Sequence, residues 1–173
     1  SGINRKLPPT DEIVDPPIIK ERNIFTVVVN KDNRLLVEED IMELSELRQA
    51  AMDFLDNGGG TDEEACNYCQ GKKDPSSSDN PEKAIISLKN DRETSYKVYI
   101  AVQNELVAAY NDLRDREFAR LNPMAGLSYT EAQKRYNDPR TASTEKANLK
   151  PKLDEVKAMY PQKLSEAEPS KTN

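Results

Sequence analysis

Two cysteines, Cys66 and Cys69, have the spacing in this chain that most directly indicates chemistry. A Cys-x-x-Cys pair acts as a redox dithiol when a helix N-terminus that follows a strand stabilises the first thiolate. Here the pair instead follows a glycine run and the acidic stretch Asp62-Glu63-Glu64, which disfavours a thiolate. Two thiolates are also only half of a tetrahedral zinc site. A local disulfide or a pair of inert thiols is therefore the favoured interpretation, and a redox dithiol or a metal site shared between two copies are the alternatives.

The chain contains no histidine, which narrows the chemistry further. Ser-His-Asp and Cys-His nucleophiles and histidine-containing zinc sites are excluded. The carboxylates are scattered among lysines and arginines and form no paired acid-base site, and the net charge of -6 includes no basic block for nucleic acid. We therefore expect a protein that is not an enzyme, that uses no cofactor or metal, and that does not bind nucleic acid.

The elements that position these residues begin at Asn23. The β-branched run 24–29, the turn residues 30–33 and the apolar run 35–37 predict a β-hairpin. An exposed hairpin can offer a sheet edge to a partner strand, but its residues are apolar on both faces, which favours a central position in the sheet or in a dimer. Asp40, with Glu43 three residues later, predicts the start of an amphipathic helix that ends near residue 57.

A second α/β unit follows after a break. Residues 84–88 predict a short buried strand, and a cap at Thr94 or Ser95 opens a long helix. Its tyrosines suggest an aromatic ligand platform, but Tyr99 and Tyr110 lie on or beside the apolar stripe. Core packing, with each hydroxyl reaching a partner at the rim, is the favoured interpretation.

The last third of the chain has a weaker pattern. Ser128 and Glu131 form a capping box that opens a short helix, and Pro151 is expected in the first turn of another helix that ends at Tyr160. Residues 162–167 are a candidate edge strand. The order β-β-α-β-α, extra helices, β predicts an α/β (α+β) fold: a small mixed β-sheet with two main helices on one face.

Composition divides the chain into three parts. Residues 1–22 are expected to be a proline-rich tether that joins the domain to a segment upstream. Residues 23–168 are expected to form one domain, and 169–173 a C-terminal tail. Insertions at 57–83 and 119–150 do not fit the core pattern, and the glycines and serines of the first indicate an exposed loop.

Five stretches of the sequence, in this order, resemble the ExbD/TolR family, and specifically the Bacteroidota branch of ExbD. The stretches are INRKLPP (3–9), IKERNIFTVVVN (19–30), SLKNDRETSY (87–96), VQNELVAAYNDLRD (102–115) and MYPQKLSEAEP (159–169). The resemblance covers most of 3–56, 84–118 and 150–169. It leaves out mainly the two insertions.

The resemblance implies a role in energy transduction. Family members are anchored in the inner membrane by one helix, with this domain in the periplasm, and form a dimer inside a ring of ExbB. They use the proton motive force to drive TonB, which powers nutrient import across the outer membrane. A TolR-like subunit that binds peptidoglycan and a periplasmic thiol oxidoreductase using Cys66 and Cys69 are the alternative functions.

The pair Leu7-Pro8 matches the leucine-proline signature of the family just outside the membrane. The resemblance implies that these two residues contact a partner, with TonB as the expected one. A passive, semi-rigid proline spacer is the alternative interpretation.

Overall fold

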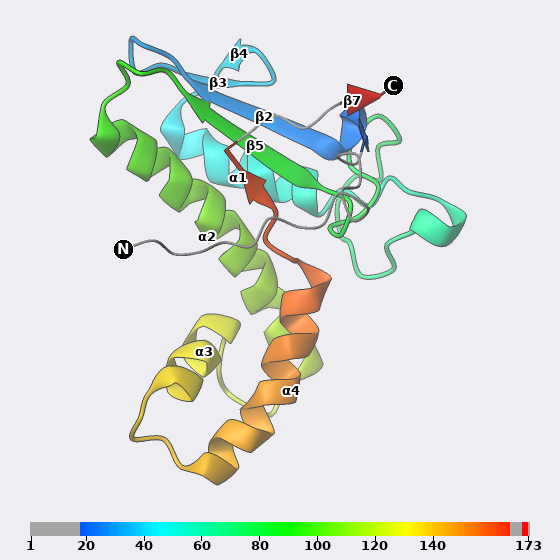
Figure 1. Ribbon diagram of the computed structural model, residues 1–173. Coiled ribbons are helices and arrows are strands. Elements are labelled where there is room, and N and C mark those ends of the chain that lie inside the picture. Colours follow the sequence, from blue (N-terminus) through cyan, green and yellow to red (C-terminus); the bar gives the residue numbers. More distant parts are fainter. Residues whose placement is uncertain (1–17, 167–170, 173) are drawn as a thin grey trace, which may run out of the picture.

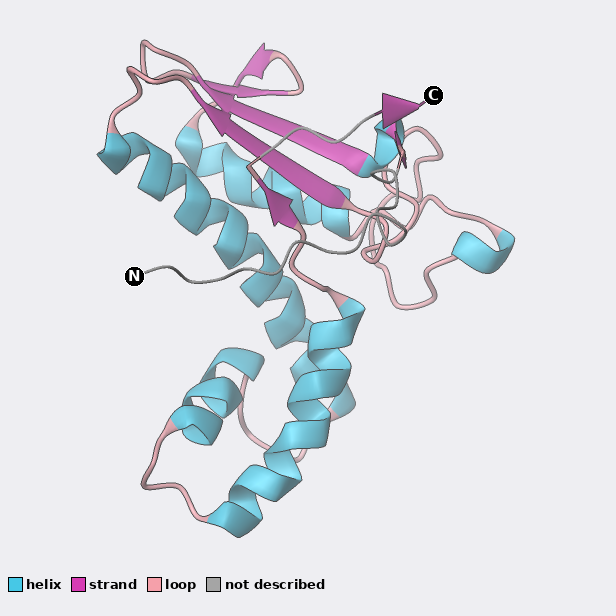
Figure 2. Cartoon of the chain, in the orientation of Figure 1, coloured by secondary structure: helices cyan, strands magenta, loops and turns pink. Residues whose placement is uncertain are grey.

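A mixed β-sheet forms the centre of the molecule in the computed structural model, which describes residues 18–166 and 171–172 (Figures 1 and 2). Its strand order is β4-β3-β2-β5-β6, with β2 parallel to β5, β5 parallel to β6, and the other pairs antiparallel. The strands are β2 (Ile24–Val29), β3 (Leu35–Val37), β4 (Asp40–Ile41), β5 (Ile85–Asn90) and β6 (Leu164–Ser165). A separate parallel pair joins β1 (Ile19–Lys20) to β7 (Lys171–Thr172).

Two helices, α1 (Leu44–Leu55) and α2 (Tyr96–Leu121), cover one face of this sheet (Figure 1). The side chains of Phe25, Val27 and Val29 alternate along β2 toward these helices and are buried. The predicted fold class, a small mixed sheet with two main helices on one face, is confirmed. Within the described part of the chain, no helix is both long enough and apolar enough to cross a membrane.

Beyond the sheet, α2 continues into a helical arm formed by its C-terminal end, α3 (Tyr129–Asn137) and α4 (Ser143–Met159). The arm has its own apolar cluster, which is separate from the main core. Its buried members are Phe118, Tyr129, Ala132, Leu149, Leu153 and Val156. Both predicted helices of the last third are present, and α3 begins with the predicted capping box of Ser128 and Glu131.

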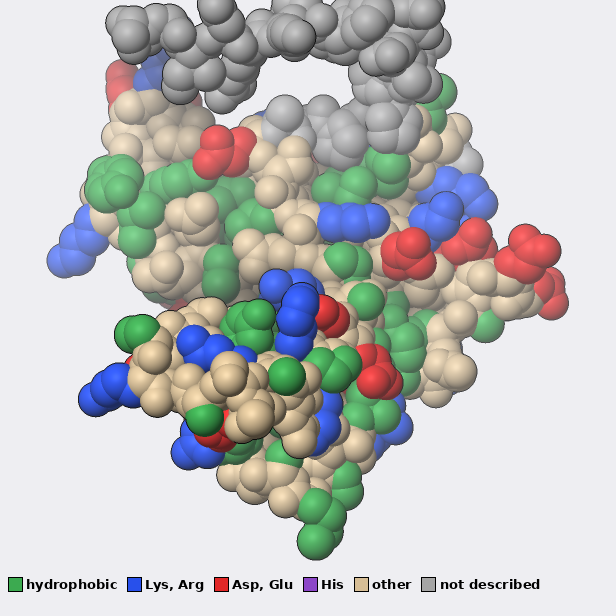
Figure 3. Space-filling model, turned by 60° about the horizontal axis from the view of Figure 1, so that its bottom comes forward, with side chains coloured by type: hydrophobic (Ala, Val, Ile, Leu, Met, Phe, Trp, Pro, Cys, Tyr) green, Lys and Arg blue, Asp and Glu red, His purple; other side chains and the backbone are tan. Residues whose placement is uncertain are grey.

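The two insertions differ in charge as well as in structure. The first insertion (57–83) has six acidic and three basic residues, and the second (119–150) has three acidic and six basic residues. Figure 3 shows acidic side chains over the outer end of the first insertion, around the short 3-10 helix η3 (Asp62–Glu64), and basic side chains over the arm.

Two predicted helix starts are wrong. Asp40 does not open α1, because Glu38 and Glu39 adopt positive φ angles of 51° and 73° and form a tight turn that sends residues 40–41 back along β3 as β4. Pro151 lies inside α4 rather than in its first turn. Its missing N–H costs the hydrogen bond to the Ala147 carbonyl, while its ring lies on the exposed side of the helix.

Three finer predictions are confirmed. Strand β6 lies at the edge of the sheet, and β2 of the hairpin lies at its centre between β3 and β5. The buried Tyr110 accepts a hydrogen bond from the Lys163 amide at 3.2 Å, and Tyr99 donates one to Glu166 at 2.8 Å. Both tyrosines therefore pack against the core and satisfy their hydroxyls at its rim.

Candidate functional site

The candidate site is built largely by the first insertion, and its cysteines form a disulfide. Cys66 and Cys69 are joined to each other, with 7% and 6% of their surfaces exposed. Of the two forms that the favoured interpretation allowed, a local disulfide or a pair of inert thiols, the structure has the disulfide. In this state neither sulfur is a thiolate that could hold a metal ion.

The other predicted site residues, Leu7 and Pro8, lie outside the described residues. Their contact with a partner therefore stays a prediction.

The composition of the first insertion predicts an exposed loop. The segment does have little regular structure, but several of its residues are buried. Asn57 is 3% exposed and its side chain links three points of the segment. Its amide group donates to the carbonyl oxygens of Asp74 and Ser78, both at 2.8 Å, and its side-chain oxygen accepts from the Asp74 amide at 3.0 Å. In this segment, hydrogen bonds from one buried side chain satisfy backbone groups that regular backbone hydrogen bonds would satisfy in a strand or helix.

A second set of contacts fixes the insertion to the start of β2. The carboxylate of Asp79 accepts hydrogen bonds from Arg22 at 3.0 and 3.2 Å and from the Asn23 amide group at 3.0 Å. The Asp79 amide in turn donates to the Asn23 side chain at 2.8 Å. Burial alone opposes ionisation of Asp79, but the hydrogen bonds from Arg22 and Asn23 outweigh it and lower the pKa of this carboxyl.

Glycines allow the insertion to lie directly on the end of α1. The Gly71 amide donates to the Asp56 carbonyl at 2.9 Å, and a Cβ at Gly71 would overlap that oxygen. A Cβ at Gly59 would overlap the Asp74 carbonyl oxygen in the same way. Close backbone approach of this kind is a recognised role of glycine.

A network of tyrosines and charges links the insertion to the arm. The Tyr68 hydroxyl donates to the Met159 carbonyl at 2.6 Å, and its ring lies edge-on to Tyr160, 5.5 Å between centroids. Tyr160 donates to Asp56 at 2.5 Å, and Arg116 binds the same carboxylate with two hydrogen bonds of 2.7 and 3.0 Å. Burial, together with the Asp56 carboxylate, raises the pKa of Tyr160. Because these groups satisfy one another, we interpret this network as a structural joint.

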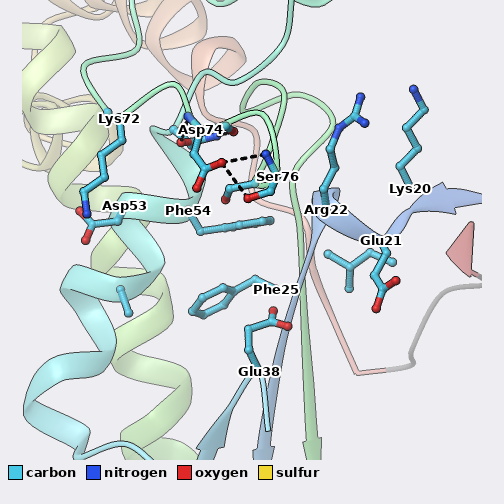
Figure 4. Close-up of a pocket in the computed structure, with 15 residues that line it drawn as sticks. Lys20, Glu21, Arg22, Phe25, Glu38, Asp53, Phe54, Lys72, Asp74 and Ser76 are labelled. Atoms are coloured by element: carbon cyan, nitrogen blue, oxygen red, sulfur yellow. Dashed lines mark hydrogen bonds between the residues drawn. The ribbon is translucent and has the colours of Figure 1, made fainter. Parts of the chain in front are cut away.

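Between β2, α1 and the insertion lies a cavity of about 740 Å³ (Figure 4). Its floor is apolar, formed by Ile24, Phe25, Ala50 and Phe54, and the two phenylalanine rings stack with their centroids 5.1 Å apart. The wall opposite β2 comes from residues 71–77 of the insertion. The contacts that order the insertion therefore also shape this cavity.

Charged side chains surround the phenylalanine rings. Lys72 points toward Asp53 on the α1 side, Lys20 and Glu21 lie on the opposite side, and Glu38 lies beside Phe25 (Figure 4). One carboxylate oxygen of Glu38 accepts from the Thr26 amide at 2.8 Å.

Two carboxyl groups of the rim have shifted pKa values. Burial raises the pKa of Glu38, although the hydrogen bond from the Thr26 amide partly opposes this. The pKa of Asp74 is lowered by the hydroxyl and the amide of Ser76, which donate to it at 2.7 and 2.8 Å.

No pattern in the sequence indicated that these residues line a cavity. Phe25 lies in the predicted hairpin strand 24–29, Phe54 lies in the helix predicted to end near residue 57, and the polar residues of the insertion belong to no motif. No family model matches the chain, and no curated protein matches it. The geometry of the cavity is therefore the main guide to what this surface binds.

Proposed function

We propose that this chain is the periplasmic domain of an ExbD-type subunit, which couples the proton motive force at the inner membrane to TonB-dependent import across the outer membrane. The order of elements is the observation that carries the proposal. A hairpin, a helix, a parallel strand, a long helix and a returning edge strand follow one another as the resemblance implies. Four of the five resembling stretches lie wholly or mainly on this core, outside the insertions.

In this proposal the domain is a partner-binding module. It belongs to a homodimer within an ExbB-type ring, is held to the inner membrane by a helix that precedes Ile3, and drives a TonB-type protein. The periplasm is an oxidising compartment, which suits the disulfide of the first insertion.

Purification of the full-length gene product from native membranes tests the proposal. We expect ExbB-type and TonB-type proteins to copurify, and we expect the gene upstream of Ile3 to encode about twenty apolar residues that include one Asp. Retention on purified cell wall without a TonB-type partner would instead favour the TolR-like alternative. Absence of any apolar segment upstream would contradict both.

A transport assay tests the tether. We expect the double variant Leu7→Ala, Pro8→Ala to lose TonB-dependent growth at normal protein abundance. The matched control is Pro16→Ala, Pro17→Ala, which changes the same tether outside the signature and should grow like the parent. Equal growth of both variants would leave the tether as a passive spacer.

A further inference from the structure

Charged side chains surround the cavity beside Phe25 and Phe54. Within residues 18–166 and 171–172, the side chains of Lys20, Glu21 and Lys72 form no hydrogen bond or ion pair. Arg22, by contrast, is paired with Asp79 at 3.0 Å. Cations and carboxylates that remain available around one cavity can serve a ligand with charges of both signs.

The floor of the cavity differs from its rim. It presents two stacked rings and aliphatic groups, and the one amide in its lining, Asn57, uses its donor and acceptor groups within the insertion. Cofactor sites usually have a few fixed polar groups that orient the ligand from within. An apolar centre with a solvated, charged rim is instead the anatomy of a protein–protein anchor site.

The charges also have a defined arrangement around the rings. Glu38 lies beside Phe25, with only one of its two carboxylate oxygens bonded to Thr26, while Lys72 lies across the cavity on the α1 side (Figure 4). Asp53 lies beside Lys72 at that end, and its carboxylate accepts a hydrogen bond from Gln49 at 2.8 Å. A ligand seated on the rings therefore meets the Glu38 carboxylate at one end and, at the other, the Lys72 ammonium next to the Asp53 carboxylate.

We propose that this cavity binds an extended peptide segment of a partner protein. An aromatic or large aliphatic side chain of the segment packs on the two phenylalanine rings, a basic residue faces Glu38, and an acidic residue faces Lys72. The first insertion would thus have a purpose: it supplies the wall and the cation of a peptide site. The proposal does not depend on membership in a proton-driven complex, so either can fail without the other.

Amide chemical shifts of the 15N-labelled 173-residue chain test the site directly. The probes are the peptides acetyl-Lys-Ala-Phe-Ala-Glu-amide and acetyl-Glu-Ala-Phe-Ala-Lys-amide, which cover both chain directions. We expect one of them, at about 1 mM, to shift the amides of Thr26, Gly71 and their neighbours. The same peptide with Ala in place of Phe should bind at least about tenfold more weakly, because it loses the anchor.

Three pairs of variants locate the binding. Ala50→Trp fills the cavity and should weaken binding by at least about tenfold, whereas Ser45→Trp, on the exposed part of the same helix, should not. Glu38→Gln and Lys72→Gln should each weaken binding about threefold, as expected for a charge pair at a solvated rim. Their neighbours provide the matched controls, Glu39→Gln and Lys73→Gln, which should leave binding unchanged.

Several results would overturn the proposal. They are the absence of shifts from both peptides at about 10 mM, shifts confined to another surface, and equal binding by the Ala50→Trp and Ser45→Trp variants. Shifts that persist when Ala replaces Phe in the peptide would also contradict it, because they would show that charge alone is recognised.

Discussion

The two insertions are ordered by different forces. The first insertion (57–83) holds a single short 3-10 helix and is fixed by hydrogen bonds from buried polar side chains and by a disulfide. The second insertion (119–150) contributes helices that close over an apolar cluster. Similar lengths of chain outside the core pattern thus reach a defined structure through polar contacts in one case and through hydrophobic burial in the other.

This difference bears on what each insertion can do. Polar contacts fix the backbone of the first insertion while leaving side chains such as Lys72 available at the cavity rim. The arm packs most of its large apolar side chains on one another, with Met124 as an exposed exception. We therefore place the partner site on the first insertion.

Among the variants that separate the two insertions, Phe118→Ala is expected to cause the largest loss of stability. Phe118 is fully buried in the arm and lies edge-on to Tyr129, with 6.5 Å between ring centroids. Its truncation should destabilise the arm by about 4 kcal/mol. In hydrogen exchange we expect α3 and α4 to lose protection while residues 57–83 keep theirs. Asn104→Ala, at an exposed position of the same helix, is the control, and simultaneous loosening of both insertions would break the comparison.

Asn57→Ala should have the opposite effect on the two insertions. It removes three hydrogen bonds and leaves the Asp74 amide without its partner, while the Asp74 and Ser78 carbonyl groups keep their bonds from the Ser77 and Gly59 amides. We expect a cost of about 3 kcal/mol. Protection should be lost in the first insertion and retained in the arm. Asn67→Ala, at an exposed position of the same insertion, should leave both unchanged.

The two insertions also differ in how far sequence could predict them. The capping box of Ser128 and the apolar spacing of the last third predicted both arm helices, because helices and hydrophobic clusters follow local and periodic rules. The role of Asn57 depends on partners 17 and 21 residues away in a segment without periodicity. Nothing in the sequence signals such contacts.

The core and the candidate site also differ in how far the sequence could predict them. The sheet and its covering helices followed from runs of β-branched residues and apolar stripes. The start of α1 was mispredicted because a turn with positive φ at Glu38 and Glu39 uses residues that normally disfavour it. The cavity combines Phe25, Glu38, Phe54 and residues 71–77, which come from four separate segments, and only the fold brings these together.

The disulfide provides a smaller test of the first insertion. The double variant Cys66→Ala, Cys69→Ala should lose about 2 kcal/mol in the free energy of unfolding, because the crosslink restricts the unfolded chain. Urea unfolding measures this, and reduction of the parent protein should produce a comparable loss. A variant as stable as the parent would show that the hydrogen bonds alone order the insertion.

The smallest expected effect concerns how the free energy of unfolding depends on pH through Asp79 of the first insertion. The folded state lowers the pKa of Asp79 below its ordinary value of 3.8, so its contribution to stability is present above that value and is lost as the pH falls through the folded pKa. Asp79→Asn should remove this acid-dependent part of the unfolding free energy. An unchanged pH profile in the variant would mean that Arg22 and Asn23 do not stabilise the charged form.

Photo-crosslinking in native membranes tests the central claim, that the cavity walled by the first insertion binds a partner protein, most directly. A photoreactive phenylalanine is placed at Ala50 in the cavity, and as a control at Ser45 on the exposed part of the same helix. The account predicts an adduct with one partner protein from position 50 and none from position 45, and the proposed function adds that this partner is a TonB-type protein. Equal adducts from both positions, or none from position 50, would contradict it.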